Sequence, residues 1–147
     1  MPMTLQSTAF GPDGTIPVDH TCEGANLSPP LVWSGVPEGA ASLLVTCADP
    51  DAPRGMFRHW AVCNLPASAT GLAAGDTGGD AAINDFGRAG YGGPCPPRGD
   101  RPHRYVFRVA ALSARLAPGD AARCADVEAL ARPYELDHAE LHGRFGR

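Results

Sequence analysis

Glycine and proline recur about every eight to twelve residues along this chain, and no other feature constrains its fold as strongly. The 147 residues include 18 glycines and 15 prolines. Both residue types interrupt regular helices and strands, so the segments between them are short. This spacing is typical of a protein made of many short strands joined by turns. A chain of this length is expected to form a single domain that spans residues 1–147.

The positions of the apolar residues predict where the strands lie. A nearly continuous apolar run at residues 42–48 is typical of a strand that is covered on both faces. Residues 104–112 form the clearest strand pattern of the chain. Residues 71–85 are rich in glycine and acidic side chains, which predicts a surface loop with little structure of its own. Further strands are expected at residues 5–9, 31–33, 59–65 and 135–145.

One short helix is expected between residues 120 and 132. Apolar residues recur there at helical spacing: Ala121, Cys124, Ala125, Val127 and Leu130. A proline at position 133 would end this helix. Because the other ordered segments have the character of strands, the chain is predicted to be an all-β protein. Its predicted architecture is a β-sandwich of two packed antiparallel sheets, with the one helix near the C-terminus.

The charge and hydropathy patterns exclude several classes of partner. The formal net charge is −4, and the 12 basic residues are all arginines, scattered without a basic stripe. Nucleic acid is therefore not an expected partner. No apolar run approaches the roughly 20 residues that span a bilayer, so no membrane span is expected. Residues 1–11 lack the basic and apolar regions of a secretory signal, and a cytoplasmic location is expected.

The five cysteines form no CxxC pair, and their number is odd. Reduced thiols that pack in the interior of a cytosolic protein are therefore the expectation. Cys47 and Cys63 lie within predicted strands and are expected in the core. Cys22 and Cys95 lie in predicted loops, and the sequence leaves open whether they pair.

A carboxylate and an imidazole flank the loop between two predicted strands. Asp49 ends the first strand and His59 begins the second. If these strands pair as an antiparallel hairpin, both residues lie at the same edge of the sheet. The loop between them contains Pro50 and Pro53, and a stiff loop loses little entropy when it binds a ligand. Each residue taken alone is more often structural than functional.

A second group of polar residues follows a glycine- and proline-rich loop at residues 90–99. The two-residue period of a strand places His103 and Tyr105 on the same face as Phe107, at the polar mouth of the core. Gly92 and Gly93 lack side chains, so their backbone N–H groups could approach a ligand closely. Imidazoles, a phenol and backbone donors suit a phosphate or carboxylate that is bound by hydrogen bonds.

Two motifs in this order resemble the phosphatidylethanolamine-binding protein family, in its bacterial branch often called Raf-kinase-inhibitor-like. The first is Asp-Pro-Asp-Ala-Pro at residues 49–53, followed by His59-Trp60. The second is Gly-Pro-Cys-Pro-Pro-Arg-Gly at residues 93–99, which leads into His103-Arg104-Tyr105. The resemblance extends over nearly the whole chain, and it is carried further by the segments 16–33, 84–87 and 143–147.

The resemblance implies a β-sandwich with a small anion-accepting pocket at one end. It suggests a cis peptide bond between Ala52 and Pro53. No catalytic residue, metal ligand or cofactor is expected. By motif position the ligand-binding residues are Asp49, Pro53, His59, Gly92, Gly93, Pro94, Pro96, His103 and Tyr105.

The expected function is that of a non-catalytic binding protein for phosphate, a phosphorylated or phospholipid head group, or a nucleotide. A kinase or protease inhibitor that acts through protein contact is a second hypothesis, and a homodimer is a further expectation from the resemblance. A hydrolase that uses the His/Asp cluster, directly or as a metal triad, is a third. The chain lacks the HExxH, GxSxG and P-loop motifs. An imidazole close to Asp49 should keep its proton above pH 6.5, roughly its ordinary pKa, so anions should bind more tightly at about pH 6 than at about pH 8.

Overall fold

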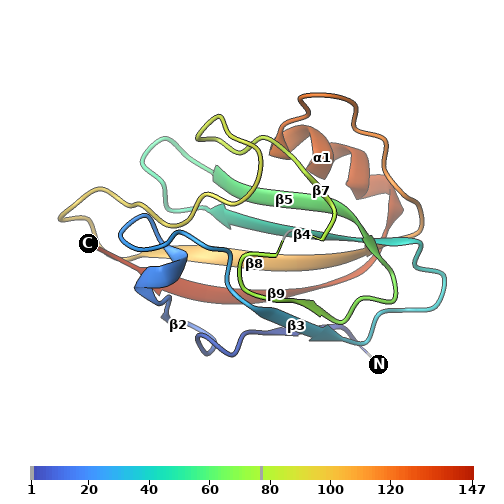
Figure 1. Ribbon diagram of the computed structural model, residues 1–147, viewed down its shortest axis with the longest axis horizontal. Helices are drawn as coiled ribbons and strands as arrows, with labels where there is room; N and C mark the ends of the chain where they lie inside the picture. The colour runs from blue at the N-terminus through green and yellow to red at the C-terminus, as the bar shows by residue number, and fades with distance from the viewer. Residues whose placement is uncertain (1, 77) are drawn as a thin grey trace.

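Strands arranged in two sheets make up most of the fold, as predicted (Figure 1). The computed structural model describes residues 2–76 and 78–147. One α-helix and two short 3-10 helices accompany the strands in the part of the chain that is described. In chain order the elements are β1 (Thr4–Gln6), β2 (Gly14–Thr15), η1 (Val18–His20), β3 (Leu31–Ser34), β4 (Ser42–Asp49), β5 (Phe57–Pro66), β6 (Gly71–Leu72), β7 (Asp80–Ala81), β8 (His103–Leu112), α1 (Cys124–Ala131), η2 (Arg132–Tyr134) and β9 (Glu135–Phe145).

The larger sheet has six strands in the order β2-β9-β8-β4-β5-β7, and the smaller sheet has the order β1-β3-β6. Strand β4 lies inside the larger sheet, antiparallel to both β5 and β8. The predicted antiparallel pairing holds for the other paired strands that are described, whereas β2 pairs with β9 in parallel through Gly14 and Gly143. The chain reaches β2 from the other sheet and not through a hairpin, so no tight turn imposes an antiparallel direction.

The larger sheet is covered on both faces. On one face Val45, Trp60 and Phe107 pack against the smaller sheet. On the other face Leu44 and Cys63 pack against the helix α1. Figure 1 shows α1 on one side of the larger sheet and β3 on the other. This arrangement explains the continuous apolar run of β4, because its alternate side chains enter two different cores.

Two local predictions need correction. The helix begins at Cys124 and not at residue 120, because Ala121 has φ +56° and a residue in the left-handed region cannot belong to an α-helix. Residues 71–85 are not a featureless loop, because they contain β6 and β7, which extend the two sheets by one short strand each. No helix in the described ranges is long and apolar enough to cross a membrane.

Candidate functional site

The candidate site lies where β4 ends and β5 and β8 begin. Because neighbouring antiparallel strands run in opposite directions, the last residue of β4 and the first residues of its two partners share one end of the sheet. Asp49 is the last residue of β4 and His103 is the first of β8. Figure 1 shows the β4–β5 loop, the loop before β8, η1 and the C-terminus gathered at this end.

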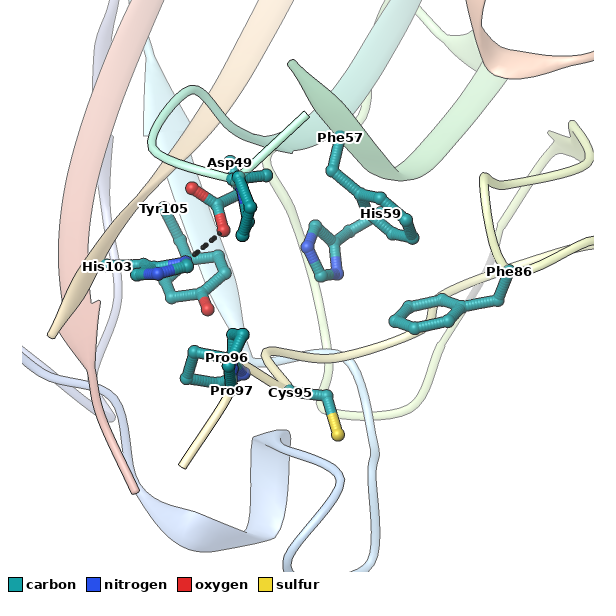
Figure 2. A pocket seen from close by; sticks show the side chains of 11 residues that line it. Asp49, Phe57, His59, Phe86, Cys95, Pro96, Pro97, His103 and Tyr105 are labelled. Atoms are coloured by element: carbon teal, nitrogen blue, oxygen red, sulfur yellow. Dashed lines mark hydrogen bonds and ion pairs between the residues drawn. The ribbon is translucent and has the colours of Figure 1, made fainter. Parts of the chain in front are cut away.

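A cavity of about 190 Å³ opens at this end of the sheet (Figure 2). Among the residues predicted from the sequence, it is lined by Asp49, Pro53, His59, Pro96, His103 and Tyr105. Cys95 and Pro97 also line it and belong to the loop of residues 92–97 to which the resemblance points, whereas the sequence reasoning missed Ala52, Phe57 and Phe86. Ala52 and Phe86 lie inside segments that carry the resemblance, 49–53 and 84–87, and Phe57 stands two residues before His59, so their places in the sequence were a usable signal.

Gly92, Gly93 and Pro94 do not line the cavity, and the expectation that the glycine N–H groups face a ligand is wrong. The Gly92 N–H donates to the carbonyl oxygen of His59 at 3.0 Å, and the Gly93 N–H donates to Asn26 Oδ1 at 2.8 Å. A Cβ atom at Gly93 would collide with the backbone of His20. The glycines therefore allow the loop to pack closely behind the cavity wall.

Asp49 forms its hydrogen bond with His103 and not with His59. His103 Nδ1 lies 2.7 Å from Asp49 Oδ2, as the dashed line in Figure 2 marks, and His103 Nε2 lies 3.0 Å from Asp100 Oδ2. The side chains of Asp49 and His103 are only 5% and 6% exposed, whereas that of Asp100 is 40% exposed. Asp49 Oδ1 also accepts the Asp51 N–H at 2.8 Å.

The two carboxylates hold a proton on His103. Burial by itself would lower the pKa of His103, but the hydrogen bonds and charges of Asp49 and Asp100 outweigh it, and the pKa is raised. With both ring nitrogens donating to carboxylates, the ring is an imidazolium. Asp100 is absent from the residues predicted from the sequence, although it stands three residues before His103.

His59 behaves in the opposite way. Its Nδ1 lies 2.6 Å from the Gly92 carbonyl oxygen, which can only accept, so Nδ1 carries the hydrogen. Burial lowers the pKa of His59, and the opposing effects of the Gly92 hydrogen bond and the Asp49 charge do not offset it. The neutral ring therefore presents a lone pair at Nε2. The expectation that an imidazole close to Asp49 keeps its proton above its ordinary pKa is correct in direction for His103 and wrong for His59.

An aromatic group surrounds His59. The ring centroids of Phe57 and Tyr105 lie 4.8 and 5.4 Å from that of His59, and that of Phe86 lies 5.4 Å away. Phe86 reaches this position from a turn that is fixed by the buried Asn84, whose Oδ1 accepts the Phe86 N–H at 2.9 Å. These rings exclude water from one side of the cavity, which accounts for the effect of burial on His59.

Tyr105 has a buried hydroxyl group with no hydrogen-bond partner among the described residues. Figure 2 shows this hydroxyl directed toward the side of the cavity formed by Pro96. Burial, and then the charge of Asp49, raise the pKa of Tyr105 well above its ordinary value, so the phenol is a neutral donor. A buried polar group without a partner costs about 1–3 kcal/mol, which a ligand acceptor would recover.

A disulfide bond joins Cys22 to Cys95. It answers the question that the sequence left open, and the expectation of reduced thiols is wrong for this pair. The other three cysteines are free and buried. Within the segment 94–97 only Cys95 has a backbone N–H, because the other residues are prolines.

The described backbone contains no cis peptide bond, so the Ala52–Pro53 bond is trans and the expectation of a cis bond is wrong.

The described residues contain no group of three or more His, Cys, Asp or Glu side chains that could hold a metal ion. The metal triad considered from the sequence is therefore not formed, because Asp49 and His103 are hydrogen-bonded to each other and His59 faces a carbonyl oxygen. What the cavity offers is a neutral phenol donor and an imidazole that can accept a proton.

Comparisons with known proteins show which chains and which fold this protein is similar to. Residues 6–146 match the family model described as phosphatidylethanolamine-binding protein. A Methanothermobacter thermautotrophicus protein, UPF0098, is 43% identical over 99% of both chains. A Mycobacterium tuberculosis protein, named as a candidate lipoprotein, LppC, is 43% identical over 80% of this chain and 60% of its own length. The crystal structure of Escherichia coli YbcL, described as a new member of the mammalian PEBP family, superposes with a TM-score of 0.93 at 37% identity. The superposition covers 100% of this chain and 99% of the YbcL chain.

Proposed function

Since this chain belongs to the phosphatidylethanolamine-binding protein family, we propose that its cavity binds a small oxyanion, such as phosphate or a phosphorylated head group, and catalyses no reaction. The observation that carries the proposal is the buried Tyr105 hydroxyl, which lacks a partner. Cys95 also lines the cavity, and no acceptor is found for its N–H in the described part of the chain, which makes this N–H a candidate second donor. An anionic oxygen between these two groups would satisfy both.

The charges around the cavity indicate what kind of anion fits. Asp49 and Asp100 together outweigh the single positive charge of His103. Arg147, whose Nε donates to the Pro96 carbonyl oxygen, brings a second positive charge to the cavity wall, so these charges roughly cancel. A ligand anion therefore enters a site without an excess positive charge, and hydrogen bonds from neutral donors and proton uptake on His59 would stabilise it. Binding without catalysis agrees with this chemistry. Both histidines have their Nδ1 atoms engaged, and the described residues that line the cavity include no serine, threonine, lysine or free cysteine.

Replacing Tyr105 by phenylalanine tests the proposal, because it should change stability and affinity in opposite directions. The variant loses an unpartnered hydroxyl, so its free energy of unfolding should be unchanged or raised by about 1 kcal/mol. Its affinity for inorganic phosphate should fall about tenfold, because a hydrogen bond to a charged acceptor is lost. Calorimetric titration and thermal unfolding measure the two effects. The exposed Tyr134→Phe variant is the matched control, and an unchanged affinity in Tyr105→Phe would refute the proposed role of the cavity.

The pH dependence of binding is expected to come from His59. In the free protein burial keeps the pKa of His59 below its ordinary value, and a bound anion should raise that pKa. Affinity should therefore rise as the pH falls between the raised and the lowered pKa, by up to about tenfold per pH unit. Sulfate is the better probe, because it does not titrate in this range. His59→Gln should remove the dependence and the exposed His138→Gln should keep it; a flat profile in the unmodified protein contradicts the proposal.

The compartment in which the chain works is a separate part of the proposal. Disulfides persist in oxidising compartments and are rare in the cytosol. The Cys22–Cys95 bond therefore favours an oxidising compartment over the cytoplasm expected from the sequence, and the naming of LppC as a candidate lipoprotein agrees with this. The single domain, the homodimer and a protein partner stay predictions.

A further inference from the structure

We propose that the Cys22–Cys95 disulfide is a redox-sensitive tether of the cavity wall, and that its reduction by a dithiol weakens oxyanion binding without unfolding the protein. The inference rests on the proposed function, because oxyanion affinity is the property that the tether would control. It starts from the position of Cys95, which is the one residue that both lines the cavity and forms a disulfide in the described chain.

The disulfide is accessible, whereas the free thiols are not. Cys22 and Cys95 are both partly exposed. Cys47, Cys63 and Cys124 are each 0% exposed, and burial raises the pKa of all three thiols. A thiol exchanges with disulfides only as an exposed thiolate, so the buried cysteines cannot compete for the bond. The pair can therefore open and close without rearrangement to a wrong partner.

Cys95 itself is held by little except the disulfide. The carbonyl groups of the residues on either side of Cys95 are hydrogen-bonded. Pro94 O accepts the Cys22 N–H at 3.1 Å, and Pro96 O accepts the Arg147 Nε–H at 2.7 Å. Between these two points no other hydrogen bond involves Cys95 in the described structure. Opening the disulfide should therefore loosen the Cys95 peptide while the two flanking ties keep the loop in place.

The peptide that would loosen is the one that carries the backbone donor of the wall. Prolines on both sides leave the segment 94–97 with a single N–H, which belongs to Cys95. A donor contributes most to binding when it is already held in the bound geometry, and mobility lowers that contribution. Reduction thus acts on a group proposed to contact the anion, and it leaves Tyr105 and His59 in place because they lie on β8 and β5.

The opening reaction is an ordinary thiol–disulfide exchange with a dithiol reductant. One thiolate of the reductant attacks a cysteine sulfur, the S–S bond breaks, and the departing thiolate takes up a proton. The second thiol of the reductant then resolves the mixed disulfide. The protein gains two electrons and two protons as two thiols, and the reductant leaves as its own disulfide. An oxidised dithiol reverses the reaction.

The experiment is a titration of inorganic phosphate into the oxidised protein and into the same protein reduced with a dithiol, below its unfolding temperature. Reduction should weaken binding about three- to tenfold. The Cys22→Ser/Cys95→Ser protein should bind as weakly as the reduced protein in both buffers. The Cys63→Ala protein, which lacks a buried thiol but keeps the bond, should respond to the reductant like the unmodified chain. Circular dichroism should show that the reduced protein stays folded.

Equal affinities in the two redox states would overturn the tether while leaving the proposed function intact. Loss of binding that accompanies loss of the circular dichroism signal would also overturn it, because the bond would then support the whole fold. If the oxidised protein binds neither phosphate nor sulfate, the proposed function fails and the tether fails with it.

Discussion

Replacing Asp49 by alanine is expected to lower the free energy of unfolding by about 3–5 kcal/mol, because the change leaves a buried imidazolium without its closest partner. Asp49 accepts one hydrogen bond from His103 at 2.7 Å and another from the Asp51 N–H at 2.8 Å, and both donors lose their acceptor. The remaining partner of His103, Asp100, is 40% exposed and is therefore screened by water. Urea unfolding followed by tryptophan fluorescence measures the loss.

The pH at which the measurement is made should change the result, and the sign follows from His103. Its pKa is raised in the folded state, so the stability it contributes is fully present below the unfolded pKa of about 6.5 and is lost as the pH rises through the folded pKa. Asp49→Ala removes part of that contribution. The destabilisation should therefore be larger at about pH 6 than at a pH above the raised pKa, where His103 is neutral in both states.

Two further variants separate charge from hydrogen bonding. Asp49→Asn keeps an acceptor of the same shape and should cost less than Asp49→Ala, by about 1–2 kcal/mol. Asp120→Ala removes an exposed carboxylate far from the cavity in sequence and should change the stability by less than about 0.5 kcal/mol. If Asp49→Ala is no more costly than Asp120→Ala, the buried ion pair does not stabilise the fold.

The main strands and their faces could be predicted from the sequence because local patterns determine them. The apolar run of β4 and the two-residue alternation that places His103 and Tyr105 on one face both reflect strand geometry. The start of α1 could not be predicted, because the left-handed conformation of Ala121 depends on the loop around it. The parallel pairing of β2 depends in the same way on how the chain crosses between the sheets.

In the candidate site, too, the features set by local sequence patterns could be predicted, and those set by the surrounding fold could not. The sequence placed Asp49 at the end of a strand, but it could not show which histidine Asp49 would bind. That choice depends on β8 and β5 flanking β4 on opposite sides, which is a property of the strand order. The pKa of His59 was misjudged because burial by Phe57 and Phe86 outweighs the nearby carboxylate, and Phe86 comes from a loop. The resemblance to a known family joined the two halves of the pocket, which strand periodicity could not do.

Removing the disulfide with the Cys22→Ser/Cys95→Ser double change is expected to lower the free energy of unfolding by about 2–4 kcal/mol. The bond links residues 73 positions apart, so in the unfolded chain it closes a long loop and excludes many extended conformations. The entropy of closing such a loop corresponds to about 4 kcal/mol, and strain in the folded state reduces the observed value. Dithiol treatment should lower the stability of the unmodified protein by the same amount and leave the double variant unchanged.

The loss of stability does not measure what the disulfide does in the cavity, because the larger effect arises in the unfolded chain. A fold of this size has about 5–15 kcal/mol of stability, so a loss of this magnitude leaves most molecules folded. In those molecules the β4–β8 pairing and the His103–Asp49 contact do not involve the bond. If the bond acts mainly on the unfolded chain, the double variant should refold more slowly or unfold faster while its folded core stays the same. Val45 and Val109 pair with each other between β4 and β8. The chemical shifts of their methyl groups should therefore be the same in the double variant and in the oxidised protein. Chemical-shift changes throughout the core would contradict this origin of the stability.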